Sequence, residues 1–253
     1  MPRDSLSLPL VASADPSNGY HQIMWTPFLI VKMRNYFLVL LGLLLGACAS
    51  APAISTQYSG KDLGAAVVAI GAPPGYHYTS YSLRFRKVGE TTPSGTPTGT
   101  FQYKTRSFLI GDAPDYQIEG ESGVVVSATL PAGKYEIFDF ALFFTNRIYS
   151  ENFSSSSPFS IPFEVRTGET AYLGNYFALP RYGARRLGVP QRAGALFTVE
   201  NRQETDTAIA RKKSLGTLAA VVANYTPSVE QLSRPFFITR EQRERIQKQD
   251  QEE

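Results

Sequence analysis

Side chains that could act as a nucleophile, a general base or a soft metal ligand are scarce in this chain of 253 residues, which holds one cysteine and two histidines. A lone cysteine excludes an intrachain disulfide and any multi-cysteine metal site. After Cys48 the only imidazole is that of His77. As a general base, His77 would need a partner such as Ser80, Ser82 or Asp62. Because no G-x-S-x-G or S-x-x-K sequence supports such a pairing, we expect a structural histidine and no enzymatic activity.

Four carboxylates lie close together in the sequence, at Asp112, Asp115, Glu119 and Glu121. Carboxylate oxygens are ligands of hard cations such as Ca²⁺, and a pair of carboxylates can also serve a glycosidase. The spacing matches no EF-hand loop, however, and connections between strands are ordinarily polar. We therefore expect no metal site and no cofactor.

Four arginines follow in a segment punctuated by glycine and proline, at Arg181, Arg185, Arg186 and Arg192. The planar guanidinium binds phosphate or carboxylate groups through two parallel hydrogen bonds, so these are candidate anion-binding residues. The alternative is an ordinary solvated loop. A second basic run at residues 211–213 would complement the C-terminus of a helix. The formal net charge is only +3, which gives no argument for a nucleic-acid partner.

The cysteine stands at the end of a short apolar segment. Arg34 precedes the ten-residue run Tyr36–Leu45, and two small residues, Gly46 and Ala47, precede Cys48. A membrane span needs about 20 apolar residues, so the run has instead the layout of a secretory signal peptide. A membrane helix that reached back to residue 28 would include two positive charges, which are costly in hydrocarbon.

The four residues Leu45-Gly46-Ala47-Cys48 resemble the lipobox of bacterial lipoproteins. The resemblance implies that the Cys48 sulfur carries diacylglycerol through a thioether and that a peptidase cuts between Ala47 and Cys48. It also implies acylation of the new amine, with fatty acids such as palmitate. Ala49, and not aspartate, follows the cysteine, which is similar to the outer-membrane sorting signal of enterobacterial lipoproteins.

The composition changes sharply after the first 33 residues, which hold all three methionines and the only tryptophan, Trp25. Residues 1–32 precede a complete signal peptide at 33–47, and we interpret them as a mis-assigned start or an extended leader outside the fold. The true start would then be Met33 or Met24. Residues 48–60 are small and polar and predict a flexible tether.

Beyond residue 60 apolar and polar residues alternate, which is typical of strands with one wet face. The expected strands cover residues 63–70, 81–86, 101–106, 124–130, 135–144, 159–166, 171–179 and 195–201. The run Pro131-Ala132-Gly133 predicts a hairpin between two of them, and Pro162 predicts an edge strand or a bulge. Residues 89–99 and 150–158 read as long loops. Thr205-Asp206 would begin a helix.

We therefore predict a mainly β fold, an antiparallel β-sandwich of about seven or eight strands over residues 61–201. A helical segment at 202–239 would follow, and then a charged tail at 240–253 that is either a solvated helix end or frayed. The heptapeptides at 130–136 (LPAGKYE) and 168–174 (GETAYLG) resemble uncharacterised bacterial lipoproteins with an Ig-like or transthyretin-like domain. That resemblance implies a fold and no activity.

Together these features predict a lipoprotein anchored in the outer membrane and facing the periplasm, whose non-enzymatic sandwich binds or assembles components of the cell envelope. Its partners would be membrane lipid, through acylated Cys48, and an envelope protein or an anionic envelope polymer. The alternative is a periplasmic hydrolase of cell-wall or glycan substrates, which would need polar groups converging in a cleft. A ligand carrier would instead need an apolar cavity between the sheets.

Overall fold

The computed structural model describes residues 52–75, 77–92, 95–105, 111–118, 120–146, 148–186, 189–214, 218–228 and 230–252. These ranges contain eleven strands and two helices: β1 (Leu63–Ala72), β2 (Ser80–Lys87), β3 (Thr98–Lys104), β4 (Tyr116–Ile118), β5 (Glu121–Pro131), β6 (Gly133–Thr145), β7 (Ser150–Ser154), β8 (Ile161–Val165), β9 (Thr170–Arg186), β10 (Val189–Glu200), α2 (Gln203–Lys213), β11 (Val222–Asn224) and α3 (Arg240–Glu252). The leader, the signal peptide and Cys48 lie outside the described residues.

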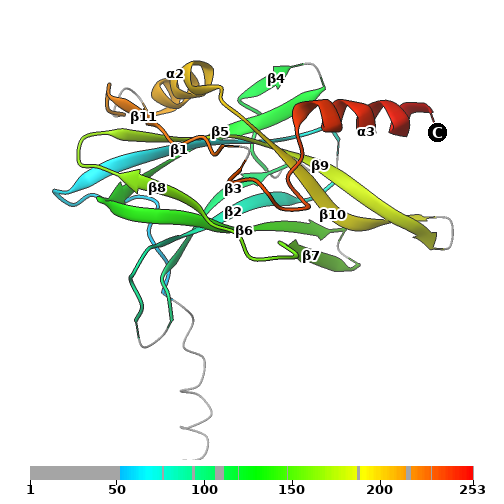
Figure 1. Ribbon diagram of the computed structural model, residues 1–253, viewed down its shortest axis with the longest axis horizontal. Coiled ribbons are helices and arrows are strands. Elements are labelled where there is room, and N and C mark those ends of the chain that lie inside the picture. Colours follow the sequence, from blue (N-terminus) through cyan, green and yellow to red (C-terminus); the bar gives the residue numbers. More distant parts are fainter. Residues whose placement is uncertain are drawn as a thin grey trace, which may run out of the picture. The chain divides into compact units, whose positions relative to one another are not determined.

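The predicted β-sandwich is confirmed, since two sheets face one another across one apolar core (Figure 1). One sheet has the order β10-β9-β1-β5-β4, with β11 added to β9; the other has the order β3-β2-β6-β7, with β8 added to β6. The first sheet is mixed, because β1 and β11 both pair with β9 in parallel. The fold is thus not antiparallel throughout.

Strand β1 is apolar on both faces because it is covered on both sides. Ala66, Val68 and Ile70 belong to the core between the sheets. The alternate residues Val67 and Ala69 belong to a second cluster, on the outer face of the sheet, that also holds Ala210 of α2 and the buried Tyr172. Figure 1 shows α2 lying over this outer face. Side chains of a strand point alternately to the two faces, so the continuous apolar run is what a doubly covered strand requires.

Aromatic residues fill the core at the end where β2 leads into β3. The rings of Phe85 and Phe101 stack with their centroids 4.5 Å apart, and Tyr135 stacks on Phe163 at 5.4 Å. Gly99, directly opposite Phe85 on β3, leaves room for that ring, because a Cβ there would lie only 2.1 Å from it. The many phenylalanines and tyrosines therefore serve packing.

The hairpin predicted around Pro131-Ala132-Gly133 is wrong. β5 pairs with β1 and β4, whereas β6 pairs with β2, β7 and β8 in the opposite sheet. The turn therefore carries the chain from one sheet to the other. Its residues signal that the chain reverses, but they do not say which strand lies beside which. Pro162 does lie on an edge strand, β8, as predicted.

Three local predictions also need correction. Residues 150–154 form β7 along β6, where a loop was expected, because an edge strand with a wet face needs few apolar residues. Helix α2 begins at Gln203, not at the expected Thr205-Asp206 cap, and Asp206 is buried in its first turn. Within 202–239, residues 222–224 form β11 and extend the sheet.

The predicted tether is in large part a structural strap. Ile54 donates its backbone N–H to the carbonyl of Thr98 at 2.8 Å, and Tyr58 donates to Thr129 at 3.0 Å. Thr98 belongs to β3 and Thr129 to β5, so the segment 52–58 joins the edges of both sheets. The Ile54 side chain packs against the core between the sheets.

The charged tail, expected either as a solvated helix end or as frayed chain, forms helix α3. Thr239 and Gln242 form a reciprocal capping box, in which the Gln242 N–H donates to Thr239 Oγ1 and the Thr239 N–H donates to Gln242 Oε1. The helix is held to the first sheet by Arg243, whose side chain is only 7% exposed. A charged residue, not an apolar stripe, docks this helix.

Candidate functional site

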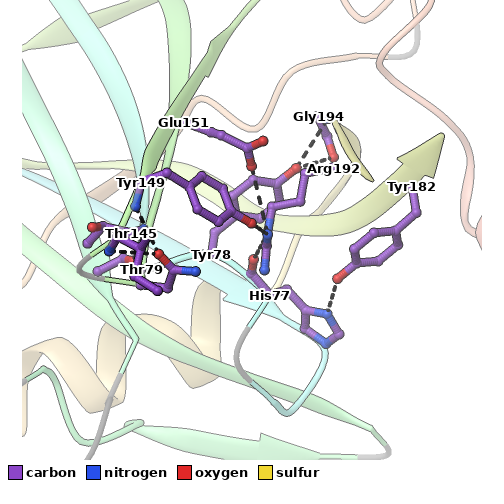
Figure 2. A network of polar contacts seen from close by, with 11 residues as sticks. His77, Tyr78, Thr79, Thr145, Tyr149, Glu151, Tyr182, Arg192 and Gly194 are labelled. Carbon is purple, nitrogen blue, oxygen red and sulfur yellow. Dashed lines mark hydrogen bonds and ion pairs between the residues drawn. The ribbon is translucent and has the colours of Figure 1, made fainter. Parts of the chain in front are cut away.

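A network of polar contacts gathers at the end of the sandwich where β1 leads into β2 and β9 leads into β10 (Figure 2). Three consecutive residues of the β1–β2 loop, His77, Tyr78 and Thr79, supply its centre. Arg192 and Gly194 reach it from β10, and Tyr182 reaches it from β9. The network therefore joins the two sheets through side chains of both.

Tyr78 ties the loop to a bulge in β10. Its buried hydroxyl donates to the Gly194 carbonyl at 2.8 Å and accepts from the Gly194 N–H at 3.1 Å. Burial raises the pKa of Tyr78 to about 12, so the hydroxyl stays protonated and able to donate. Gly194 has a φ of +90° where the β9–β10 register shifts, which favours glycine at this position.

Thr79 and Thr105 fix the same loop to the second sheet. The Thr145 N–H donates to Thr79 Oγ1 at 3.0 Å, and Thr105 Oγ1 donates to the Tyr78 carbonyl at 2.6 Å. These contacts hold the loop to β6 and to the residue after β3. These hydrogen bonds therefore fix the position of the loop.

The guanidinium of Arg192 contacts other groups of the protein. Its Nε donates to the His77 carbonyl at 2.7 Å, and its Nη1 lies 3.7 Å from Glu151 Oε2 on β7. The guanidinium also covers the ring of Phe144, 3.2 Å from its centroid, and only 14% of the side chain is exposed. Arg192 therefore clamps β7 and β6 to the loop and is not available to an external anion.

His77 lies at the edge of this network. Its Nδ1 is 2.8 Å from the Tyr182 hydroxyl, and its Nε2 is 3.4 Å from the carbonyl of Pro74. Two of the partners considered for catalysis make other contacts. Asp62, which precedes the start of β1, accepts a hydrogen bond from Tyr58, and Ser82 accepts one from Gln102. Through these contacts, His77 joins the β1–β2 loop to β9.

The acidic side chains are likewise distributed among separate partners. Asp115 accepts hydrogen bonds from the Val125 N–H and from Lys213 Nζ, the latter at 2.6 Å, so it anchors the end of α2 to the sheet. Asp112 accepts from the backbone N–H of Lys104, at the end of β3, and Glu121 is bound by arginines. Glu119 lies outside the described residues. In the part of the chain that the structure describes, no group of three or more His, Cys, Asp or Glu could hold a metal ion.

Of the two predicted anion-binding arginines whose side chains the structure describes, Arg181 and Arg192, it is Arg181 that borders a hollow. It lines a hollow of about 360 Å³ together with Ser154, Ser156, Phe153 and Phe236. The side chains of residues 185 and 186 lie outside the description, and Arg192 is bound internally. Among the described side chains of the predicted cluster, Arg181 is therefore the one placed to contact a ligand. It lies beside two serines and two aromatic rings.

A second hollow, of about 460 Å³, lies where the segment 232–239 and α3 meet β10. Val199, Leu232 and Phe237 line it, and Glu200 and Arg240 stand with them. The lining therefore combines apolar and charged side chains. Among the described residues no helix is long and apolar enough to cross a membrane.

A pH dependence follows from the surroundings of His77. Burial, with a smaller contribution from the charge of Arg192, lowers the pKa of the imidazole. Because the pKa of the imidazole is lower in the folded chain, the unfolded chain binds a proton below about pH 6.5 that the folded chain does not bind. The free energy of unfolding therefore falls as the pH is lowered through that range. We expect wild type to lose more stability between pH 7.5 and 5.5 than His77→Gln does in urea unfolding. An identical loss in both proteins would contradict this assignment.

Comparison with known proteins leaves the chain without a family. No protein family matches its sequence. No curated protein matches it either. A solved structure of a leucine-rich repeat protein from Bacteroides thetaiotaomicron VPI-5482 is similar over 46% of this chain and 14% of its own length, with 12% identity and a TM-score of 0.28. The chain thus spans a small fraction of that protein, and the likeness is too low to carry an argument.

Proposed function

We propose that this chain is a lipoprotein anchored in the outer membrane by acylated Cys48, with a non-enzymatic β-sandwich that binds a component of the cell envelope. The observation that carries the proposal is the motif Leu45-Gly46-Ala47-Cys48 at the end of the ten-residue apolar run Tyr36–Leu45. A thioether needs the cysteine sulfur, and the preceding run has the length of a signal peptide. The described sandwich begins only a few residues later, at residue 52.

The binding role is proposed for the hollow beside Arg181. A guanidinium next to hydroxyl groups and aromatic rings suits a ligand that carries a carboxylate or a phosphate on an apolar or sugar framework. Anionic envelope polymers have this chemistry. The position of His77, which contacts a tyrosine hydroxyl and a carbonyl, supports a binding role over hydrolysis.

The test is the intact mass of the protein purified from cell envelopes. A chain that begins at Cys48 contains neither methionine nor tryptophan, because Trp25 and all three methionines precede it. We expect the mass of residues 48–253 plus a diacylglycerol and an amide-linked acyl chain. Fluorescence should be of the tyrosine type, and selenomethionine labelling should leave the mass unchanged. A mature protein that retains Trp25 would overturn the proposal.

A further inference from the structure

The chain between the proposed lipid and the fold is very short. The strap at 52–58 is hydrogen-bonded to β3 and β5, so only residues 49–51 separate Cys48 from the first described residue, Pro52. A fully extended chain advances at most 3.3–3.6 Å per residue, which limits the separation of Cys48 and Pro52 to about 14 Å. A free tether reaching residue 60 would have allowed roughly three times that distance.

The strap also fixes which end of the sandwich is near the anchor. The N–H of Thr98 donates to the Pro52 carbonyl at 3.1 Å, and Thr98 pairs with Arg86 near the end of β2. The neighbouring Val88 donates its N–H to Lys134, at the start of β6. The β2–β3 connection therefore stands beside the point where the anchored chain enters the fold.

The polar network of Figure 2 lies at the opposite end. β6 runs from Gly133, beside the entry point, to Thr145, which is bound by Thr79. Its 13 residues span about 40 Å at the rise of an extended strand. Ile148, which is 90% exposed, stands three residues after Thr145 in the short β6–β7 connection and so lies roughly that far from Val88.

We infer that the end of the sandwich formed by the β2–β3 connection and the start of β6 faces the lipid surface, and that the end carrying His77 and Tyr182 points away from it. This inference rests on the proposed acylation of Cys48. It does not rest on charge, because two of the cations near the entry point already have acidic neighbours: Lys87 lies 3.3 Å from Glu90, and Arg166 lies 2.9 Å from Glu164. Orientation is thus set by the short covalent spacer.

Single tryptophans report the orientation cleanly, since the chain from Cys48 onward has none. Val88→Trp and Ile148→Trp place one tryptophan at each end, at side chains that are 53% and 90% exposed. Each variant, purified in its acylated form, would be reconstituted in vesicles that contain dansyl-labelled phosphatidylethanolamine. We expect several-fold stronger energy transfer to dansyl from Val88→Trp than from Ile148→Trp. Equal transfer, or stronger transfer from Ile148→Trp, overturns the inference.

Two further experiments test the orientation of the domain separately from the acylation of Cys48. In the first, residues 48–253 are coupled through the Cys48 thiol to a maleimide lipid, which tests orientation even if the cell does not acylate the protein. In the second, a long glycine-serine insertion between Ala49 and Ser50 should bring the two transfer signals close to each other. If Val88→Trp stays near the lipid despite the insertion, attraction to the surface and not the spacer sets the orientation, and the inference fails.

Discussion

Replacing the single cysteine should release the protein from lipid. In Cys48→Ser we expect complete loss of labelled palmitate, and accumulation of a soluble protein or an uncleaved precursor, because a hydroxyl does not form the thioether on which processing depends. Each buried methylene contributes about 0.8 kcal/mol, so one acyl chain gives marginal binding while two or three hold a protein firmly. Fractionation and palmitate labelling of the variant measure the effect.

The position of the thiol can be tested separately from its presence. The double variant Cys48→Ser/Ala51→Cys restores one cysteine three residues later, outside the Leu45–Cys48 motif. We expect it to remain unlabelled, whereas Ala51→Ser alone should behave as wild type. Unchanged labelling and membrane retention in Cys48→Ser would refute the lipoprotein assignment.

What the sequence predicts well is local. The alternation of Tyr81, Leu83 and Phe85 with polar residues identifies β2, because the period of side-chain direction belongs to the strand itself. The partner of a strand is not local, and the turn at 131–133 therefore gave the wrong hairpin. The strap at 52–58 was missed for a related reason, since small polar residues pair through their backbones with strands far along the chain.

In the candidate site, too, local features could be predicted from the sequence, whereas contacts between distant segments could not. A run of arginines indicates anion binding, and Arg181 remains open to that role. Nothing near Arg192 in the sequence says that its guanidinium will cover Phe144, because the contact depends on a bulge in β10 and on residues of another sheet. The sequence also contains no signal for the role of Tyr78.

The signal for α3 was present in the Thr239–Gln242 capping box, but the residue that docks the helix pairs with Glu121, which lies far back in the chain.

That docking depends on a group of charges on the outer face of the first sheet. Arg243 Nη1 lies 2.7 Å from Glu121 Oε1 and 3.2 Å from the Thr198 hydroxyl, to which it donates. The guanidinium also lies over the ring of Phe177, at 4.6 Å. Glu121 Oε2 is in turn 3.3 Å from Arg202, just before α2. Arg243 Nη2 also lies 3.6 Å from Glu200 Oε1, so Glu121 and Glu200 together hold α3, and Glu121 also binds the residue before α2.

Arg243→Ala should therefore free α3 from the sheet. We expect a loss of up to about 3 kcal/mol, the lower end of the range for a broken buried ion pair, because Glu121 keeps Arg202 as a partner. A free helix of 13 residues is marginal in water, so released α3 should also unfold. The measurements are urea unfolding, far-ultraviolet circular dichroism and the rate of trypsin cleavage within residues 240–248.

The matched control is Arg245→Ala, which removes the same side chain two residues later, at an exposed position of the same helix. It should change stability little, because its hydrogen bond is a weak one to the backbone of α3 itself, at 3.4 Å. Glu121→Gln should also lower the stability, because Arg202 and Arg243 both lose the Glu121 carboxylate, although Arg243 keeps Glu200 at 3.6 Å. If Arg243→Ala and Arg245→Ala unfold alike and are cut by trypsin at the same rate, α3 is held by something other than this ion pair.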